Sequence, residues 1–339
     1  MVTFLKADAF RVVVVSPVYD DAAAARHLLL HLEKTFAESD FELRVLFVDD
    51  GSPVPLHEQL SFPPLIAGIE ANVLRLRRNV GHQRAIALGL AYAHEHTECD
   101  TVLVMDADGE DRPEDALSLL SRCRNDGNSR ILFAERTRRS ESPLFQIFYR
   151  LYQVLHWVLT GIRVRVGNFS VVPSRLLPAL VTLPALWNHF AAAIFQARLP
   201  RDMMPTVRGQ RYSGISKMNL VALVVHGLQA ISVFIEVVAV RLLIAVCLFA
   251  VGCAGLLATT IALKWQSGFS LSGWAPLAAA GLLILVLAVA LGCFCLTLGF
   301  LNQRNSLDFI PIRDYSFFVE GLHPVTTSHE RTELCGRRA

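Results

Sequence analysis

The stretch TVLVMDADGEDRPE, residues 101–114, decides the fold that the sequence predicts. Residues 101–105 are mostly apolar and include two valines, which is typical of a short strand buried on both faces of a parallel sheet. An acidic run begins directly after it at Asp106. Pro113 stands where a helix can begin, because the first helical position does not need an amide hydrogen. A strand, a polar loop and a helix in this order predict part of a βαβ unit.

The same alternation runs through the N-terminal half of the chain. Alternating strands and helices predict an α/β fold with a Rossmann-like, mainly parallel sheet. The predicted strands are residues 12–15, 43–48, 73–76, 101–105 and 131–136, with helices at 22–36 and 83–94. Ligands of such sheets bind outside the carboxyl ends of the strands. One cleft should therefore collect the polar side chains that follow the strands: Tyr19, Asp20, Asp49, Asp50, Asp106 and Asp108.

Two long apolar runs predict a membrane anchor. The 339-residue chain is 53% hydrophobic and only 18% charged, below the ~25% charged residues of an ordinary soluble domain. Residues 242–263 and 277–301 contain no charged side chain, and each exceeds the ~20 residues that a helix needs to cross a bilayer. We expect a transmembrane hairpin, with a pair of core helices in a larger soluble domain as the alternative.

These runs divide the chain into four parts. Residues 1–210 form the α/β domain, residues 211–241 a juxtamembrane amphipathic segment, residues 242–301 the two spans and residues 302–339 a cytoplasmic tail. The tail is polar after Gly321, which predicts disorder.

Arginines outside the hairpin favour a multi-pass protein of the inner, cytoplasmic membrane. Arg241, Arg304 and Arg313 flank the spans, whereas the short loop between them carries one lysine, so the positive-inside rule places the α/β domain in the cytoplasm. Residues 145–159 are rich in aromatic side chains and fit either a buried core helix or a helix in the membrane interface. Gly252, Gly255 and Gly292 allow close helix contacts, which would suit a homo-oligomer.

The composition excludes other kinds of protein. A net charge of +2, with arginines scattered among acids, is too small for a nucleic-acid-binding protein. The seven cysteines form no CxxC pair and have no histidines at zinc spacing, so a thiolate metal site is not expected. Residues 1–11 lack a sustained apolar run before a cleavage site, which predicts no signal peptide.

The acidic loop is a candidate metal site. Asp106 and Asp108 are two residues apart after a strand, so their carboxylates point the same way in extended geometry. Hard oxygen ligands suit Mg²⁺ or Mn²⁺, which bind through one or two carboxylates together with substrate phosphates. Glu110 has the same parity and could be a third ligand. The alternative is a surface acidic loop without a ligand.

Six motifs together resemble a known family. The motifs are SPVYDD (16–21), VDDGS (48–52), NVGHQRAIALGL (79–90), MDADGEDRPE (105–114), GNFSVVPSR (167–175) and RYSGISKMN (211–219). In order and spacing they resemble the inverting glycosyltransferases of the dolichol-phosphate mannose synthase type, which include bacterial polyprenyl-phosphate sugar transferases. The resemblance covers about residues 11–240. It implies a GT-A fold, a nucleotide-sugar donor and a two-helix anchor.

The resemblance also implies roles for single residues. Asp106, Asp108 and Glu110 would hold the metal on the donor diphosphate, although the family commonly has Gln at the third position. Catalytic roles would fall to Asp106, Asp108, Arg211 and Lys217, with the last two facing phosphate oxygens. Without the resemblance, Arg211 and Lys217 would be snorkelling residues beside a membrane helix. Donor-binding roles are implied for Pro17, Tyr19, Asp21, Asp49, Asp50, Asn79, His82, Asp106 and Ser216.

One departure bears on the acceptor. Many relatives have an acid in a Gly-Asp-Phe-Arg segment where this chain has Gly167-Asn168-Phe169-Ser170. Asn168 cannot accept a proton as a base would. A polyprenyl phosphate acceptor needs no base because it is already an anion, so the departure favours such an acceptor or a purely positioning role for Asn168. The alternatives are transfer to a hydroxyl of a glycan or glycolipid, which needs a base, and a non-catalytic membrane scaffold.

Overall fold

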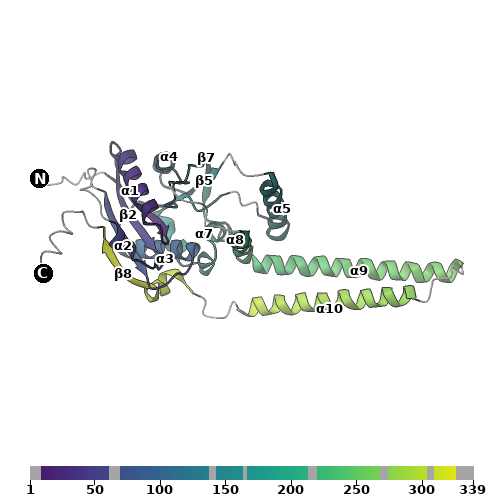
Figure 1. The fold of residues 1–339 in the computed structure, drawn as a ribbon. Helices are drawn as coiled ribbons and strands as arrows, with labels where there is room; N and C mark the ends of the chain where they lie inside the picture. Colours follow the sequence, from purple (N-terminus) through teal and green to yellow (C-terminus); the bar gives the residue numbers. More distant parts are fainter. Residues whose placement is uncertain are drawn as a thin grey trace, which may run out of the picture. The chain divides into compact units, whose positions relative to one another are not determined.

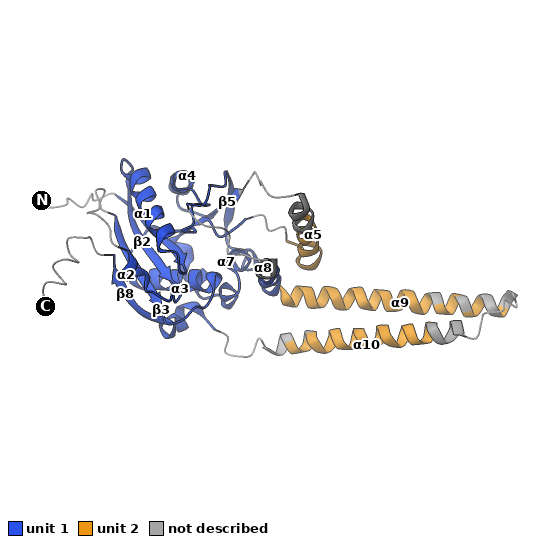
Figure 2. Cartoon of the chain, in the orientation of Figure 1, with its two compact units in different colours: residues 1–147, 164–233, 309–339 blue, residues 148–163, 234–308 orange. Residues whose placement is uncertain are grey.

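The structure is a computed structural model that describes residues 9–60, 69–136, 143–162, 166–212, 220–267, 274–303 and 309–325. The chain divides into two compact units (Figure 2). Unit 1 contains residues 1–147, 164–233 and 309–339, and unit 2 contains residues 148–163 and 234–308. Ser216 and Lys217 lie outside the described residues.

Unit 1 is built on one eight-stranded sheet (Figure 1). The strand order is β7-β5-β6-β4-β1-β2-β3-β8. The pairs β1–β2, β1–β4, β2–β3 and β5–β7 are parallel, whereas β6 and β8 pair antiparallel with their neighbours. The strands are β1 (Phe10–Val18), β2 (Phe41–Asp49), β3 (Glu70–Leu76), β4 (Thr101–Val104), β5 (Ile131–Arg136), β6 (Ser170–Pro173), β7 (Arg201–Thr206) and β8 (Val319–Pro324). The predicted α/β fold with a mainly parallel sheet is confirmed.

Helices cover both faces of the sheet because its central strands are apolar on both sides. Val12 and Val14 of β1 join a core with α1 and α4. On the other face α3 packs so closely that a Cβ added at Gly89 would lie 2.7 Å from Val15 Cγ1. The helices of unit 1 are α1 (Ala22–Phe36), α2 (Leu56–Gln59), α3 (His82–His96), α4 (Pro113–Asn125), α6 (Leu177–Val181), α7 (Phe190–Gln196), α8 (Leu220–Ser232) and α11 (Pro311–Asp314). Three short 3₁₀ turns are Ser174–Leu176, Pro184–Trp187 and Tyr315–Phe317.

The C-terminal segment corrects one prediction. The expected disorder after Gly321 is wrong up to Pro324, because β8 pairs antiparallel with β3 and supplies the hydrogen bonds that the edge of β3 needs. Arg75 Nε also donates to Glu320 Oε2 at 2.8 Å. Residues 319–324, which follow the two apolar helices in the sequence, are therefore part of the sheet of unit 1.

Unit 2 contains the two long apolar helices, α9 (Ile235–Ser267) and α10 (Trp274–Gln303), which pack against each other. Both are long and apolar enough to cross a membrane over Ile235–Thr259 and Ala279–Leu296. Only 17% and 6% of these windows are buried. Helices in the core of a soluble domain would instead be mostly covered, so the described residues do not support the core-helix alternative.

The described side chains of α5 (Pro143–Thr160) are largely apolar and exposed. Leu151 and Trp157 are exposed, whereas His156 and Thr160 are buried. Arg241 of α9 donates from Nη1 to the carbonyl oxygen of Val158 at 2.8 Å, close to the end of α5. This exposure argues against a buried core helix and is compatible with a helix in the membrane interface.

Candidate functional site

The polar loops lie at the carboxyl edge of the parallel strands, as the strand order requires. Burial raises the pKa of Asp50, and two backbone hydrogen bonds act against this effect. Asp50 Oδ1 accepts from Val80 N at 2.7 Å and Oδ2 from Gly81 N at 2.9 Å. The carboxylate of Asp49 is equally occupied, since it accepts from the amides of Ser52 and Leu56 at 3.0 Å each. Asp49 and Asp50, which are both predicted to bind the sugar donor, therefore hold the loops around the site in place.

The other residues that are predicted to bind the sugar donor have simple local environments. Asp21 Oδ1 accepts from Ala24 N at 3.1 Å and caps α1. Pro17 is buried at the end of β1, Tyr19 is 45% exposed and Asn79 is exposed. Only Tyr19 and Asn79 of these residues present an exposed side chain at this edge, and the donor roles remain predictions.

The loop after β4 folds back on itself. Asp111 is buried and its Oδ2 accepts from Asp106 N at 2.9 Å, while Asp108 Oδ1 accepts from Glu110 N at 2.9 Å. Gly109 has a φ of +91°, a conformation that favours glycine. Burial and the charge of Asp106 raise the pKa of Asp108. Four carboxylates thus lie within one short turn.

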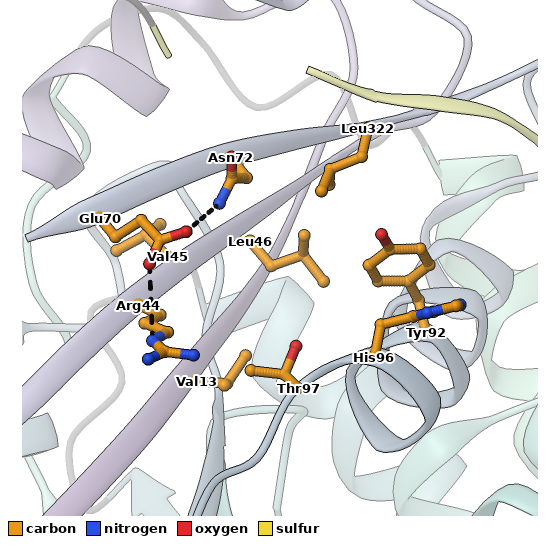
Figure 3. A pocket seen from close by; sticks show the side chains of 10 residues that line it. All are labelled: Val13, Arg44, Val45, Leu46, Glu70, Asn72, Tyr92, His96, Thr97 and Leu322. Carbon is orange, nitrogen blue, oxygen red and sulfur yellow. Dashed lines mark hydrogen bonds and ion pairs between the residues drawn. The ribbon is translucent and has the colours of Figure 1, made fainter. Parts of the chain in front are cut away.

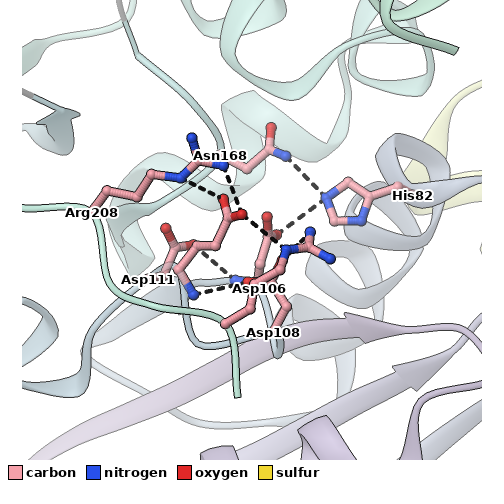
Figure 4. A network of polar contacts seen from close by, with 8 residues as sticks. His82, Asp106, Asp108, Asp111, Asn168 and Arg208 are labelled. Carbon is pink, nitrogen blue, oxygen red and sulfur yellow. Dashed lines mark hydrogen bonds and ion pairs between the residues drawn. The ribbon is translucent and has the colours of Figure 1, made fainter. Parts of the chain in front are cut away.

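Two arginines neutralise part of this charge, and Figure 4 labels one of them, Arg208. Arg208 donates from Nη2 and Nε to the two carboxylate oxygens of Glu110, at 2.7 and 3.1 Å. Arg211 donates from Nη2 to Asp108 Oδ2 at 2.6 Å and from Nε to Glu110 Oε1 at 3.0 Å. The structure therefore brings the predicted residue Arg211 to the acidic loop, together with Arg208, which the sequence did not single out.

The segment that carries these arginines is bound to the acidic loop through its backbone. Gly209 N donates to Glu110 O at 2.8 Å, and Tyr212 N donates to Asp108 O at 2.9 Å. Burial, Glu114 and Asp108 raise the pKa of Tyr212 to about 12, so its hydroxyl stays protonated. This hydroxyl lies 2.8 Å from Nδ1 of His31 in α1.

The carboxylates of Asp106 and Asp108 are hard oxygen ligands of the kind that Mg²⁺ and Mn²⁺ prefer, although both oxygens of Asp108 here accept hydrogen bonds, from Glu110 N and from Arg211. Glu110 uses both of its oxygens on arginines. Within the described ranges, no group of three or more His, Cys, Asp or Glu side chains is arranged to hold a metal ion. The role of Glu110 as a third ligand therefore stays a prediction.

His82 and Asn168 border the acidic loop on another side. His82 Nε2 lies 3.2 Å from Asp106 Oδ1 and 3.0 Å from Asn168 Nδ2. Desolvation lowers the pKa of His82, but the carboxylates of Asp106, Asp111 and Asp108 outweigh it and raise that pKa overall. Gln83, to which the sequence assigned no role, donates from Nε2 to Asn168 Oδ1 at 3.0 Å.

A pocket of about 120 Å³ elsewhere in unit 1 does not belong to this site (Figure 3). It lies between strands of the sheet and the C-terminal end of α3, where Tyr92, His96 and Thr97 line it. Its charged wall is already paired, since Arg44 lies 3.6 Å from Glu70. None of the predicted site residues lines it.

A known protein family matches the part of the chain that contains these loops. Residues 13–168 match the family model described as Glycosyl transferase family 2.

Known proteins are similar over about two thirds of their length. The uncharacterized glycosyltransferase YkcC of Bacillus subtilis is 24% identical over 226 residues, which cover 65% of this chain and 67% of that protein. The undecaprenyl-phosphate 4-deoxy-4-formamido-L-arabinose transferase of Erwinia tasmaniensis is 24% identical over 225 residues, 63% of this chain and 65% of that protein. Glucosyl-3-phosphoglycerate synthase from Mycobacterium tuberculosis, solved with Mn²⁺, UDP-glucose and phosphoglyceric acid, is similar over 68% of this chain and 79% of that chain, with a TM-score of 0.47 and 13% identity.

Proposed function

We propose that this protein transfers a sugar from a nucleotide-sugar donor to a polyprenyl phosphate, because residues 13–168 match the model of Glycosyl transferase family 2. The observation that carries the proposal is the contact of Arg211 with the acidic loop of Asp106 and Asp108. Two helices able to span a membrane would keep the protein at a membrane, which is where a lipid acceptor is found. The undecaprenyl-phosphate transferase of Erwinia supports this acceptor class.

The residues of the acidic loop would handle the donor diphosphate. A divalent cation, Mg²⁺ or Mn²⁺, held by Asp106 and Asp108 would supply positive charge for the leaving diphosphate. Arg211 lies close enough to these carboxylates to contact the same phosphates, and a guanidinium can bind two phosphate oxygens at once. Ser216 and Lys217 are proposed to contribute further donors. Glu110 would keep Arg211 and Arg208 in place.

The rest of the donor would lie along the neighbouring loops. Pro17, Tyr19 and Asp21 would contact the nucleotide at the end of β1, and Asp49 would contact its ribose. Asp50 would act indirectly, because its carboxylate accepts from Val80 N and Gly81 N and so holds the loop between Asn79 and His82.

The transfer step needs no proton acceptor on the protein. An oxygen of the acceptor phosphate forms a bond to the anomeric carbon, and the bond from that carbon to the diphosphate oxygen breaks. The electron pair leaves with the nucleoside diphosphate. Attack from the side opposite the diphosphate inverts the anomeric configuration. We place the reaction at the cytoplasmic face of the inner membrane, which agrees with the arginines that flank the two spans.

The test is a transfer assay with purified protein in lipid nanodiscs. Labelled UDP- and GDP-sugars are offered with undecaprenyl phosphate, with a neutral glycolipid or without an acceptor, each with Mg²⁺, Mn²⁺ or EDTA. We expect labelled lipid only with undecaprenyl phosphate and a divalent ion. Asp108→Asn should abolish the product, whereas Asp126→Asn, the same change at the surface end of α4, should not. Product on the neutral glycolipid alone, or turnover in EDTA, would refute the proposal.

A further inference from the structure

Phe318, directly before β8, contacts the loop that follows β3. The backbone N–H of Arg77, the first residue after β3, donates to the carbonyl oxygen of Phe318 at 2.9 Å. Cζ of Arg78 lies 5.6 Å from the centroid of the Phe318 ring. Phe318 therefore holds two consecutive residues of this loop, one through its backbone and the other through its side chain.

The ring of Phe318 is itself held by an aromatic cluster, which consists of Trp187, Phe309 and Phe318. The Phe318 centroid lies 5.1 Å from that of Trp187 and 5.5 Å from that of Phe309, which it meets edge to face. The rings of Trp187 and Phe309 are 3.8 Å apart. Arg84 of α3 covers Trp187, with its Cζ 4.9 Å from the ring centroid. Aromatic pairs and cation–π contacts depend on the orientation of the rings, so together they fix the position of Phe318.

The loop that Phe318 holds lies at the edge of the sheet where the sugar donor is proposed to bind. Ligands bind outside the carboxyl ends of parallel strands, and β3 is parallel to β2. A Cβ added at Gly51, in the loop after β2, would lie 2.5 Å from Asn79 N, so the loops after the two strands are in direct contact. Asp50 holds the other end of the loop after β3 through two backbone amides. The exposed residue Asn79 thus lies between the part held by Phe318 and the part held by Asp50.

We propose that Phe318 is a positioning residue for the donor site, because it keeps the loop of Arg77, Arg78 and Asn79 in the conformation that binds the nucleotide sugar. The inference rests on the proposed function and adds to it a residue far outside the family match of residues 13–168. A loop that is not ordered beforehand must be ordered when the ligand binds, and this cost weakens the apparent affinity. Phe318 acts on the nucleotide only through the loop. Its loss should therefore change donor binding and leave the chemical step unchanged.

The experiment measures nucleotide binding directly, by calorimetric titration of the purified full-length protein in lipid nanodiscs with UDP and with GDP, each with Mn²⁺. Phe318→Ala should raise the Kd of the nucleotide that the wild type binds by about 10-fold, the factor expected when the binding conformation is populated about one-tenth of the time. In the transfer assay, the KM for the nucleotide sugar should rise by a similar factor. The kcat and the KM for undecaprenyl phosphate should change less than about twofold. Phe318→Tyr keeps the ring, so its Kd should stay within about twofold of the wild-type value.

Two variants of the same C-terminal segment are the matched controls. Leu322→Ala also removes an apolar side chain, but Leu322 pairs with Leu74 inside β3 and not with the loop after it. This variant should lower the Tm and leave the nucleotide Kd unchanged. Phe317→Ala removes the neighbouring phenylalanine, which is 75% exposed, and should change neither quantity. The comparison of Phe318→Ala with Leu322→Ala separates positioning of the loop from a general loss of stability.

The outcomes separate this inference from the proposed function. An unchanged nucleotide Kd in Phe318→Ala, or an equal rise of that Kd in Leu322→Ala or in Phe318→Tyr, would overturn the role of the Phe318 ring. If Phe318→Ala does not fold, Phe318→Leu keeps an apolar side chain without the ring, and an unchanged Kd in that variant overturns the inference. Wild-type protein that binds neither nucleotide would instead refute the proposed function, before any variant is compared.

Discussion

Asp50→Asn should weaken both the fold and the site, because this buried carboxylate fastens the loop that begins α3. The aspartate accepts from the amides of Val80 and Gly81, whereas asparagine offers one oxygen and places its amino group against the second N–H. One hydrogen bond to a charged group is worth about 1.5–3 kcal/mol, and a buried unsatisfied donor costs about 1–3 kcal/mol. Burial raises the pKa of Asp50, so losing the charge removes a desolvation cost that offsets part of this sum.

The net expectation is a loss of about 2 kcal/mol in the free energy of unfolding, or about 4–8 °C in Tm for a domain of this size. Differential scanning fluorimetry in detergent measures the shift. His82 follows Gly81, so kcat/KM for transfer should also fall about 10-fold if the loop moves by a fraction of an ångström. Asp126→Asn is the control at the protein surface. Wild-type Tm and wild-type kcat/KM in Asp50→Asn would refute the role of this carboxylate.

Three further predictions concern the arginine, the C-terminus and pH. Arg211→Ala should lower kcat about 100-fold or more, as expected when a hydrogen-bond donor to developing charge is lost. Arg211→Lys should recover only part of this activity, because lysine cannot bridge two oxygens. A fully active Arg211→Lys variant would contradict this role. A stop codon after residue 308 removes β8 and the partner of Arg75, so the shortened protein should have a lower Tm and aggregate through β3, which light scattering would detect. Desolvation and the stacked ring of His323, with centroids 3.9 Å apart, lower the folded-state pKa of His57. The unfolded chain therefore binds more protons at this histidine. The free energy of unfolding should be unaffected by His57 above about pH 6.5 and should fall as the pH drops below that value. The charge of Arg75 also lowers the pKa of His57, whereas Glu58 and Asp49 raise it. The variant His57→Asn should therefore flatten the dependence of Tm on pH. An unchanged slope would exclude His57 as the source of this dependence.

Much of the sheet could be predicted because its signals are local. The helix Ala22–Phe36 and the strand Ile131–Arg136 have the predicted bounds, since a capping aspartate precedes the helix and the strand begins with a continuous buried run. The acidic loop also lies where strand order places it. In each case the apolar pattern and the residue that ends it lie within a few positions of each other.

The unpredicted parts depend on partners that are distant in the sequence. Arg75 and Glu320 are 245 positions apart, and β8 has an alternating, partly exposed pattern with little apolar signal. Gln83 meets a backbone amide 107 positions away, which has no side-chain signature at all. Asn168 did carry a signal, because it departs from the acid found in the resembling family. Its amide orientation required the structure.

Arg208 changes the interpretation of Glu110. From the sequence, Glu110 adds a negative charge where relatives commonly have glutamine, and a shift in metal preference would follow. In the structure the two oxygens of Glu110 accept from the guanidinium of Arg208, so this charge is largely compensated within the protein. Arg211 also pairs with Glu110 and with Asp108, so the two guanidinium groups contact two of the four carboxylates of this loop. A divalent cation on Asp106 and Asp108, as we propose, would therefore meet less uncompensated negative charge than the loop would present without these two arginines.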